Sequence, residues 1–157
     1  MVLNGKYSVI LDDKHRITLP VGLRGKLNAS SVIISKGVTR YLRLYASAEW
    51  EDKIAGVIKE TTDPFSENDL FLTAKYIHTA QDAEIDRAGR ILVAEHLLEY
   101  ANISKECVVL GSIDHIQIWD AKSYHSFSDE SNEENARKFA AASEDLSQRI
   151  KRKRGIV

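Results

Sequence analysis

The sequence has 157 residues, of which 43% are hydrophobic and 29% are charged, with a formal net charge of −1. This composition suits one ordinary folded domain or two very small ones and excludes a disordered chain. No run approaches the roughly 18 apolar residues of a membrane-spanning helix, the first residues lack a secretory-signal pattern, and the single Cys107 excludes an intrachain disulfide. We therefore expect a protein of the reducing cytosol, either a small enzyme or a binding module.

Charge is distributed unevenly along the chain. Residues 1–45 contain eight Lys and Arg against two Asp, a net +6, whereas residues 46–124 carry a net −8. Residues 125–148 carry −4, and the segment from Arg149 carries +5. Such asymmetry favours a face built for an anionic partner, and an unevenly charged solvated surface is the alternative.

The first part of the chain is predicted to form strands and a short helix. Strands are expected over 7–11 and 16–19, on either side of an acidic turn. A further strand is expected over 41–45, where leucines alternate with tyrosine and arginine. Pro20 suits the first position of a short helix, because its missing N–H costs nothing there.

Two helices are predicted between residues 47 and 78. Ser47 suits the cap of the first helix, whose expected buried face is Trp50, Ile54, Val57 and Ile58. Pro64 breaks the chain, and Ser66 and Asp69 have the spacing of a capping box. The expected buried residues of the second helix are Leu70, Ala74 and Ile77.

The chain contains an internal repeat with an offset of 74 residues. VILDDKHRITLP corresponds to the later AEIDRAGRILVA, so that an Asp, an Arg and an Ile recur at matching places. Each copy runs through a strand, an acidic turn, an Arg-led strand, a short helix, an apolar strand and an alternating strand. Because the whole order recurs, we interpret the repeat as a duplication.

The second copy predicts strands over 83–85, 90–93 and 115–119 and a helix with an apolar stripe of Ala94, Leu97, Leu98 and Ala101. A last helix is expected to begin at Ser131, with Glu134 three residues on. Its stripe is Phe139, Ala142, Leu146 and Ile150, and it ends in the basic run KRKR, which suits the negative end of a helix dipole.

No motif predicts catalysis, a metal or a cofactor. The five histidines have scattered spacings, and there is no Gly-rich phosphate loop, no GxSxG and no CxxC pair. Cys107 lies in an apolar run, which is typical of a small buried residue rather than a nucleophile. We expect no small-molecule substrate.

The two Asp-x-x-x-Arg turns are the candidate binding elements. An arginine just beyond a tight turn loses little freedom on binding, and its guanidinium can grip a phosphate or the edge of a guanine. Asp12 and Asp86 are expected to shape the turns through bonds to their own backbone. The alternative is that Arg16 and Arg90 merely pair with these aspartates.

MVLNGKYSVILDDKHRITLP, followed by EIDRAGRILVAEHLLEYA, resembles the MraZ family, whose pattern is close to D-x-x-G-R followed by apolar residues, once in each of two modules. The resemblance also covers YLRLYASAEWE and IQIWDAKSY. It implies an α+β fold of two tandem AbrB-like, swapped-hairpin β-barrel modules with short helices. We expect the modules at 5–50 and 81–124, linking helices at 51–80, and a C-terminal helix with a basic tail at 128–157.

The resemblance implies a cytoplasmic, nucleoid-associated transcriptional regulator. Such proteins form homo-oligomeric rings and bind short direct repeats of double-stranded promoter DNA upstream of a division and cell-wall gene cluster. The family's DNA-contacting arginines map onto Arg16 and Arg90, and our reading adds Lys14, His15, Arg24 and Arg87. The alternative is an antitoxin-like, oligomeric protein-interaction scaffold without specific DNA binding.

The sequence departs from the family pattern at two positions. His15 stands where the first motif has glycine, at a place that can require a positive φ, whereas the second motif keeps Gly89. Ala94 replaces the proline of the second motif, which loosens the start of that helix. The first departure bears on the direction in which Arg16 points.

Overall fold

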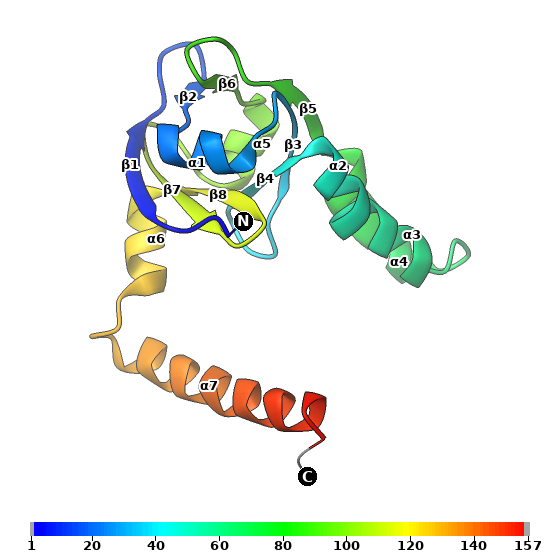
Figure 1. Ribbon diagram of the computed structural model, residues 1–157. Helices are drawn as coiled ribbons and strands as arrows, with labels where there is room; N and C mark the ends of the chain where they lie inside the picture. The colour runs from blue at the N-terminus through cyan, green and yellow to red at the C-terminus, as the bar shows by residue number, and fades with distance from the viewer. Residues whose placement is uncertain (1, 156–157) are drawn as a thin grey trace. The chain divides into compact units, whose positions relative to one another are not determined.

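The computed structural model describes residues 2–155 and divides into two compact units, the first ending at Ala121 and the second beginning at Lys122. The first unit is an α+β structure with antiparallel strand pairing, shown in Figure 1. Its main sheet has six strands in the order β1 (Lys6–Ile10), β7 (Glu106–Ser112), β8 (His115–Asp120), β4 (Leu42–Ala46), β3 (Ser31–Lys36) and β5 (Gln81–Glu84).

The two repeats are joined by strand pairing. β1 of the first repeat pairs with β7 of the second, and β5 of the second pairs with β3 of the first. β4 and β8 pair at the centre, with Arg43 opposite Gln117. Each repeat therefore completes its hydrogen bonding only with strands of the other.

The expectation of a closed β-barrel is wrong for the described residues. β1 and β5 are the two edges of the six-stranded sheet, and no ladder joins them. The strands that lead into the turns continue instead into a separate ribbon, so that the sheet stays open.

That ribbon consists of β2 (Arg16–Thr18) and β6 (Arg90–Leu92), which pair antiparallel (Figure 1). Its inner face is apolar, because Ile17 and Ile91 are fully buried in the main core. The residues on either side of each isoleucine point outward, as the period of two in a strand requires.

Two short helices follow the ribbon strands, α1 (Val21–Leu27) and α5 (Glu95–Tyr100), and bury Leu23 and Leu97. Both end in an asparagine-containing turn, where Asn28 and Asn102 have positive φ angles of 47° and 55°. The repeat thus extends to backbone conformation. Pro20 lies at the N-cap of α1, one residue before its expected place.

Residues 47–78 form a helical arm that projects from the sheet (Figure 1). It contains α2 (Ser47–Trp50), η1 (Glu51–Ala55), α3 (Gly56–Thr61), α4 (Glu67–Thr73) and η2 (Ala74–His78), of which η1 and η2 are π-helical. Trp50 packs against Ile33 and Tyr45 of the sheet and anchors the base of the arm.

Some of the predictions of burial and capping for residues 47–78 are wrong. Val57 and Leu70, expected to be buried, are 49% and 57% exposed. Ser47 is the first residue of α2 rather than its cap, and its hydroxyl hydrogen-bonds the hydroxyl of Ser31. Ser66 does cap α4, since its Oγ accepts a hydrogen bond from the Asp69 N–H at 3.2 Å.

The second unit contains most of α6 (Ala121–Ser128) and the long α7 (Glu133–Lys153). Asn132 caps α7 by accepting hydrogen bonds from the next turn, so the helix begins later than the Ser131 cap predicts. The expected stripe is solvent-exposed, with Phe139 at 67% and Leu146 at 51%. Among the described residues, no helix is long and apolar enough to cross a membrane.

Candidate nucleic-acid interface

Turn 1 (residues 12–16) is organised by the carboxylate of Asp12. Oδ1 accepts hydrogen bonds from the backbone N–H groups of Lys14 and Arg16, at 2.9 and 2.8 Å. Oδ2 accepts one from Nε of Arg16 at 2.8 Å. The Asp12 N–H also donates to the Arg16 carbonyl, which closes the loop at 3.0 Å. One side chain therefore fixes both the turn and its arginine.

Turn 2 (residues 86–90) repeats this bonding. Oδ1 of Asp86 accepts from the N–H groups of Ala88 and Arg90 at 2.9 and 2.8 Å, and Oδ2 accepts from Nε of Arg90 at 2.8 Å. The Asp86 N–H donates to the Arg90 carbonyl at 3.0 Å. Asp12 and Asp86 therefore make matching hydrogen bonds in the two turns.

The fourth residue of each turn has a left-handed backbone. His15 has a φ of 61° and Gly89 a φ of 79°, so the first motif keeps the glycine conformation with a histidine in it. The backbone carbonyl of each of these two residues also accepts a hydrogen bond from the residue that follows the other strand of the ribbon. Leu19 N–H donates to the Gly89 carbonyl at 2.8 Å, and Val93 N–H donates to the His15 carbonyl at 2.9 Å. The two turns are therefore held in one framework.

The hydrogen bonds stabilise the charged form of both aspartates. The backbone hydrogen bond from Arg16 is the largest cause that holds the pKa of Asp12 below its ordinary range, and the side-chain bond from the same residue adds to it. Arg90 lowers the pKa of Asp86 in the same way, again chiefly through its backbone N–H. Both carboxylates are thus ionised at neutral pH and paired with a guanidinium.

The pairing leaves most donors of each guanidinium available. Only Nε of Arg16 and Arg90 is hydrogen-bonded within the described residues, and the side chains are 27% and 37% exposed. The Nη groups, which are the ones that can grip a phosphate or a guanine edge, have no protein partner there. Intramolecular pairing and ligand binding are therefore compatible, because each uses a different edge of the same group.

The ribbon places the two arginines on one surface. Arg16 lies opposite Leu92 and Arg90 lies opposite Thr18, which puts the arginines on a diagonal of the antiparallel pair, about 7–8 Å apart at the backbone. Thr18 and Leu92 share this outward side and are exposed, Leu92 by 56%. We name the surface of Arg16, Thr18, Arg90 and Leu92 the ribbon face.

Two of these residues were missed by the sequence analysis. Thr18 and Leu92 each follow a buried isoleucine by one position, and the period of two in a strand could have identified them as neighbours of the arginines. What the sequence does not contain is the cross-repeat register that brings them together.

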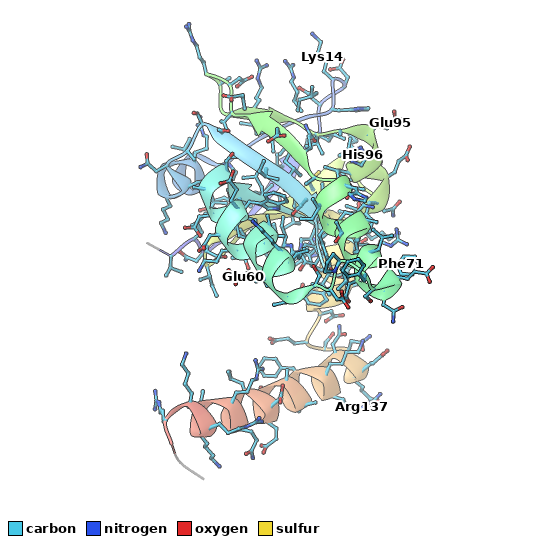
Figure 2. All side chains as sticks on the ribbon, turned by 90° about the vertical axis from the view of Figure 1, so that its right-hand side faces the viewer. Lys14, Glu60, Phe71, Glu95, His96 and Arg137 are labelled. Atoms are coloured by element: carbon cyan, nitrogen blue, oxygen red, sulfur yellow. The ribbon has the colours of Figure 1, made fainter. Side chains whose placement is uncertain are left out.

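The remaining predicted basic residues differ in position. Lys14 and Arg87 lie in the turns and are exposed, and Figure 2 shows Lys14 projecting away from the body of the first unit. Asp13 offsets Lys14, and Asp12 and Asp86 offset Arg16 and Arg90, so the formal charge of turn 1 is zero and that of turn 2 is +1, from Arg87. Arg24 instead lies against Gly89 of turn 2, with its Nε buried.

Other chemistries find no support in residues 2–155. No group of three His, Cys, Asp or Glu side chains there is arranged to hold a metal ion. Cys107 is 1% exposed, and burial raises the pKa of its thiol to about 11, so it is not poised as a nucleophile.

The chain matches the family described as "MraZ protein, putative antitoxin-like" over residues 2–71 and 77–149. A protein of Mesoplasma florum named transcriptional regulator MraZ is 33% identical over 133 residues, which is 85% of this chain and 90% of that protein. Proteins of the same name from Treponema denticola and Mycolicibacterium smegmatis are 33% and 35% identical, over 82% and 90% of this chain and 89% and 94% of their own lengths. These matches cover both repeats, and the chain belongs to the MraZ family.

Proposed function

We propose that this chain is a sequence-specific, DNA-binding transcriptional regulator and not an enzyme. The observation that carries the proposal is the pair of aspartate-anchored arginines, Arg16 and Arg90, on one exposed two-stranded ribbon. The major groove of B-DNA is wide enough for a two-stranded β-ribbon, and an arginine reads guanine there through two parallel hydrogen bonds. The relatives' name, transcriptional regulator, supports the same function.

In this proposal each side chain of the interface has a role. Arg16 and Arg90 present their Nη groups to base edges or phosphates, while Asp12 and Asp86 fix the direction of each guanidinium. Lys14 and Arg87, at the turns, contact the phosphate backbone, which positions the protein without reading sequence. His15 is exposed in turn 1 and adopts the backbone conformation that Gly89 provides in turn 2.

We further propose that binding is multivalent. One chain offers two turns and a net charge of −1, too little for tight binding on its own. A homo-oligomeric ring would place several ribbon faces on successive direct repeats of one promoter, and linked sites raise avidity by about 10²–10⁴. The helical arm supports self-association, because it exposes a set of large apolar side chains that includes Val57, Phe65, Leu70, Phe71 and Leu72.

The proposed target is the promoter of a division and cell-wall gene cluster that includes the regulator's own gene, with repression through blocked polymerase access. The protein would then act in the cytoplasm, at the nucleoid. We assign the two AbrB-like, strand-exchanging repeats to 5–50 and 81–124, the linking helices to 51–80 and the C-terminal helix and tail to 128–157. The pairing of β1 with β7 and of β5 with β3 supports such an exchange.

The second candidate function is an antitoxin-like scaffold that binds a protein. The exposed apolar arm favours it, since Phe65 alone is 96% exposed. In that case the arm would cover a toxin rather than a second copy of the chain, and the ribbon face would bind DNA without preference.

Fluorescence anisotropy decides between these functions. The full-length protein is titrated with the duplex upstream of its own gene and with a scrambled duplex of equal composition, over a range of salt. A preference of about 10³-fold or more, with affinity falling steeply as salt rises, is the expected result. Equal and weak binding of both duplexes by folded, assembled protein would refute specific DNA recognition and favour the protein-binding scaffold.

A further inference from the structure

Arg24 differs from the other basic residues of the first repeat in where its guanidinium lies. A Cβ added to Gly89 would collide with Nη1, Cζ and Nε of Arg24. The guanidinium therefore covers this glycine. Gly89 is buried as a result, although it is the left-handed residue of a turn. The contact joins helix α1 of the first repeat to turn 2 of the second.

The Nε atom of Arg24 is fully buried and has no hydrogen-bond partner among the described residues. It is therefore not free to reach a ligand outside the protein. A guanidinium whose Nε is covered and whose plane lies on a backbone is well placed to hold that backbone.

Turn 1 has no such support. At the offset of 74 residues, Leu98 corresponds to Arg24, and Gly89 corresponds to His15. A hollow of about 380 Å³ lies beside turn 1, lined in part by His15, Leu98 and Glu99. His15 itself is exposed, whereas its counterpart Gly89 is buried. Turn 1 thus combines a large turn residue, His15, with the shorter Leu98 of the adjacent helix. Turn 2 combines the small Gly89 with the longer Arg24.

We propose that Arg24 is a positioning residue for DNA recognition: it fixes turn 2, and through it Arg90, instead of contacting phosphate. This inference rests on the proposed function and deepens it. Turn 2 would then offer Arg90 in one fixed direction, while turn 1 holds Arg16 only through Asp12 and the ribbon. Gly89 provides the positive φ of the turn, and a Cβ in its place would displace the guanidinium of Arg24, which lies at the end of a flexible side chain.

A double-mutant cycle on the full-length chain tests the contact without DNA. Gly89→Asn keeps a residue that tolerates positive φ, as Asn28 and Asn102 do here, but adds a Cβ that collides with Arg24. Arg24→Leu copies the second repeat, which has Leu98. We expect Gly89→Asn alone to lower Tm by about 2–4 °C and to lower it by less than half as much in the Arg24→Leu background. Additive losses of Tm would overturn the proposal.

Salt-dependent DNA binding distinguishes positioning from phosphate contact. Arg24→Leu and Arg24→Lys are both expected to lower the affinity for the specific duplex by about tenfold without changing the slope of log K against log salt. Lys14→Ala, as the matched control, is expected to reduce that slope by about 0.9 for each subunit bound. If Arg24→Lys keeps full affinity while Arg24→Leu reduces the slope like Lys14→Ala, then Arg24 contacts phosphate and the proposal is wrong.

The two experiments separate this inference from the proposed function. Should the unaltered protein show no preference for the specific duplex, the regulator assignment fails, and the thermal cycle still decides whether Arg24 holds turn 2. Should the unaltered protein bind specifically while the cycle is additive, the regulator assignment stands and the positioning role of Arg24 is refuted.

Discussion

Turn 1 and turn 2 share their hydrogen bonds and differ in their surroundings. In both, an aspartate accepts two backbone N–H groups and the Nε of an arginine, at distances that agree within 0.1 Å. Turn 2 is covered by the guanidinium of Arg24, whereas turn 1 lies beside a hollow. The two repeats therefore share the Asp–Arg pair that directs the arginine and differ in what lies behind it, and the proposed DNA contacts belong to the shared pair.

The largest expected effect comes from removing either arginine. Arg16→Ala or Arg90→Ala should lower the specific affinity by at least about 10²-fold, because each guanine contact contributes about 1–3 kcal/mol and several subunits bind one duplex. Anisotropy titration measures the affinity, and analytical ultracentrifugation checks that assembly is intact. A variant that unfolds or dissociates would show that the arginine is structural instead.

Exchanging His15 and Gly89, the two residues of the turns with positive φ, tests whether the surroundings of the turns affect stability differently. Gly89→His should destabilise the chain by about 2–3 kcal/mol, since it adds left-handed strain and displaces Arg24. His15→Gly should change stability by less than about 1 kcal/mol, because relief of strain is offset by the greater freedom of glycine in the unfolded chain. Urea unfolding measures both, and equal costs would contradict the difference between the turns.

The predictable part of the fold is local. The spacing of Asp12 and Arg16, and of Asp86 and Arg90, predicts a turn in which the aspartate bonds its own backbone, because an Asp turn forms among neighbours in sequence. The bond from each arginine Nε to its aspartate was the alternative to ligand binding, and both turns contain it. The positive φ of His15 followed from its alignment with a glycine. The burial of Cys107 followed from its apolar neighbours.

The rest depends on partners distant in sequence. Periodicity does not reveal that β1 pairs with β7, since a strand carries no mark of which repeat completes its ladder. Val57 and Leu70 follow a helical pattern, but the pattern does not say whether the same chain covers them. Arg24 has the sequence signature of an exposed helical arginine, and only the cross-repeat contact with Gly89 identifies its position.

A smaller effect is expected from weakening the aspartate anchors. Asp12→Asn and Asp86→Asn keep an oxygen that accepts from the turn but remove the charge that pairs with Nε, so the preference for specific over scrambled DNA should fall by about tenfold. Asp13→Asn is the matched control, because it removes the same charge from an exposed neighbour. If the control lowers the preference equally, the anchors act through general charge and not through direction.

The smallest effect is a shift in acid titration. The pKa values of Asp12 and Asp86 are lowered, so the stabilisation that they provide is complete above the unfolded value of about 3.9 and is lost as pH falls through the lower folded values. Carboxyl carbon NMR of the full chain should show both midpoints below 3.9. A midpoint at or above that value for either residue would contradict the bonding found in its turn.

The proposed recognition requires that the Nη groups of Arg16 and Arg90 contact DNA while Nε stays paired. Its most direct test is the charge-conserving double variant Arg16→Lys with Arg90→Lys, titrated with the specific and the scrambled duplex. Lysine keeps the charge and the attraction to phosphate, but it lacks the planar fork by which a guanidinium donates from Nε to the aspartate and from Nη to a guanine. We predict that binding to the specific duplex falls to the level of the scrambled one, which itself changes little. A double variant that keeps the unaltered protein's preference would contradict the account.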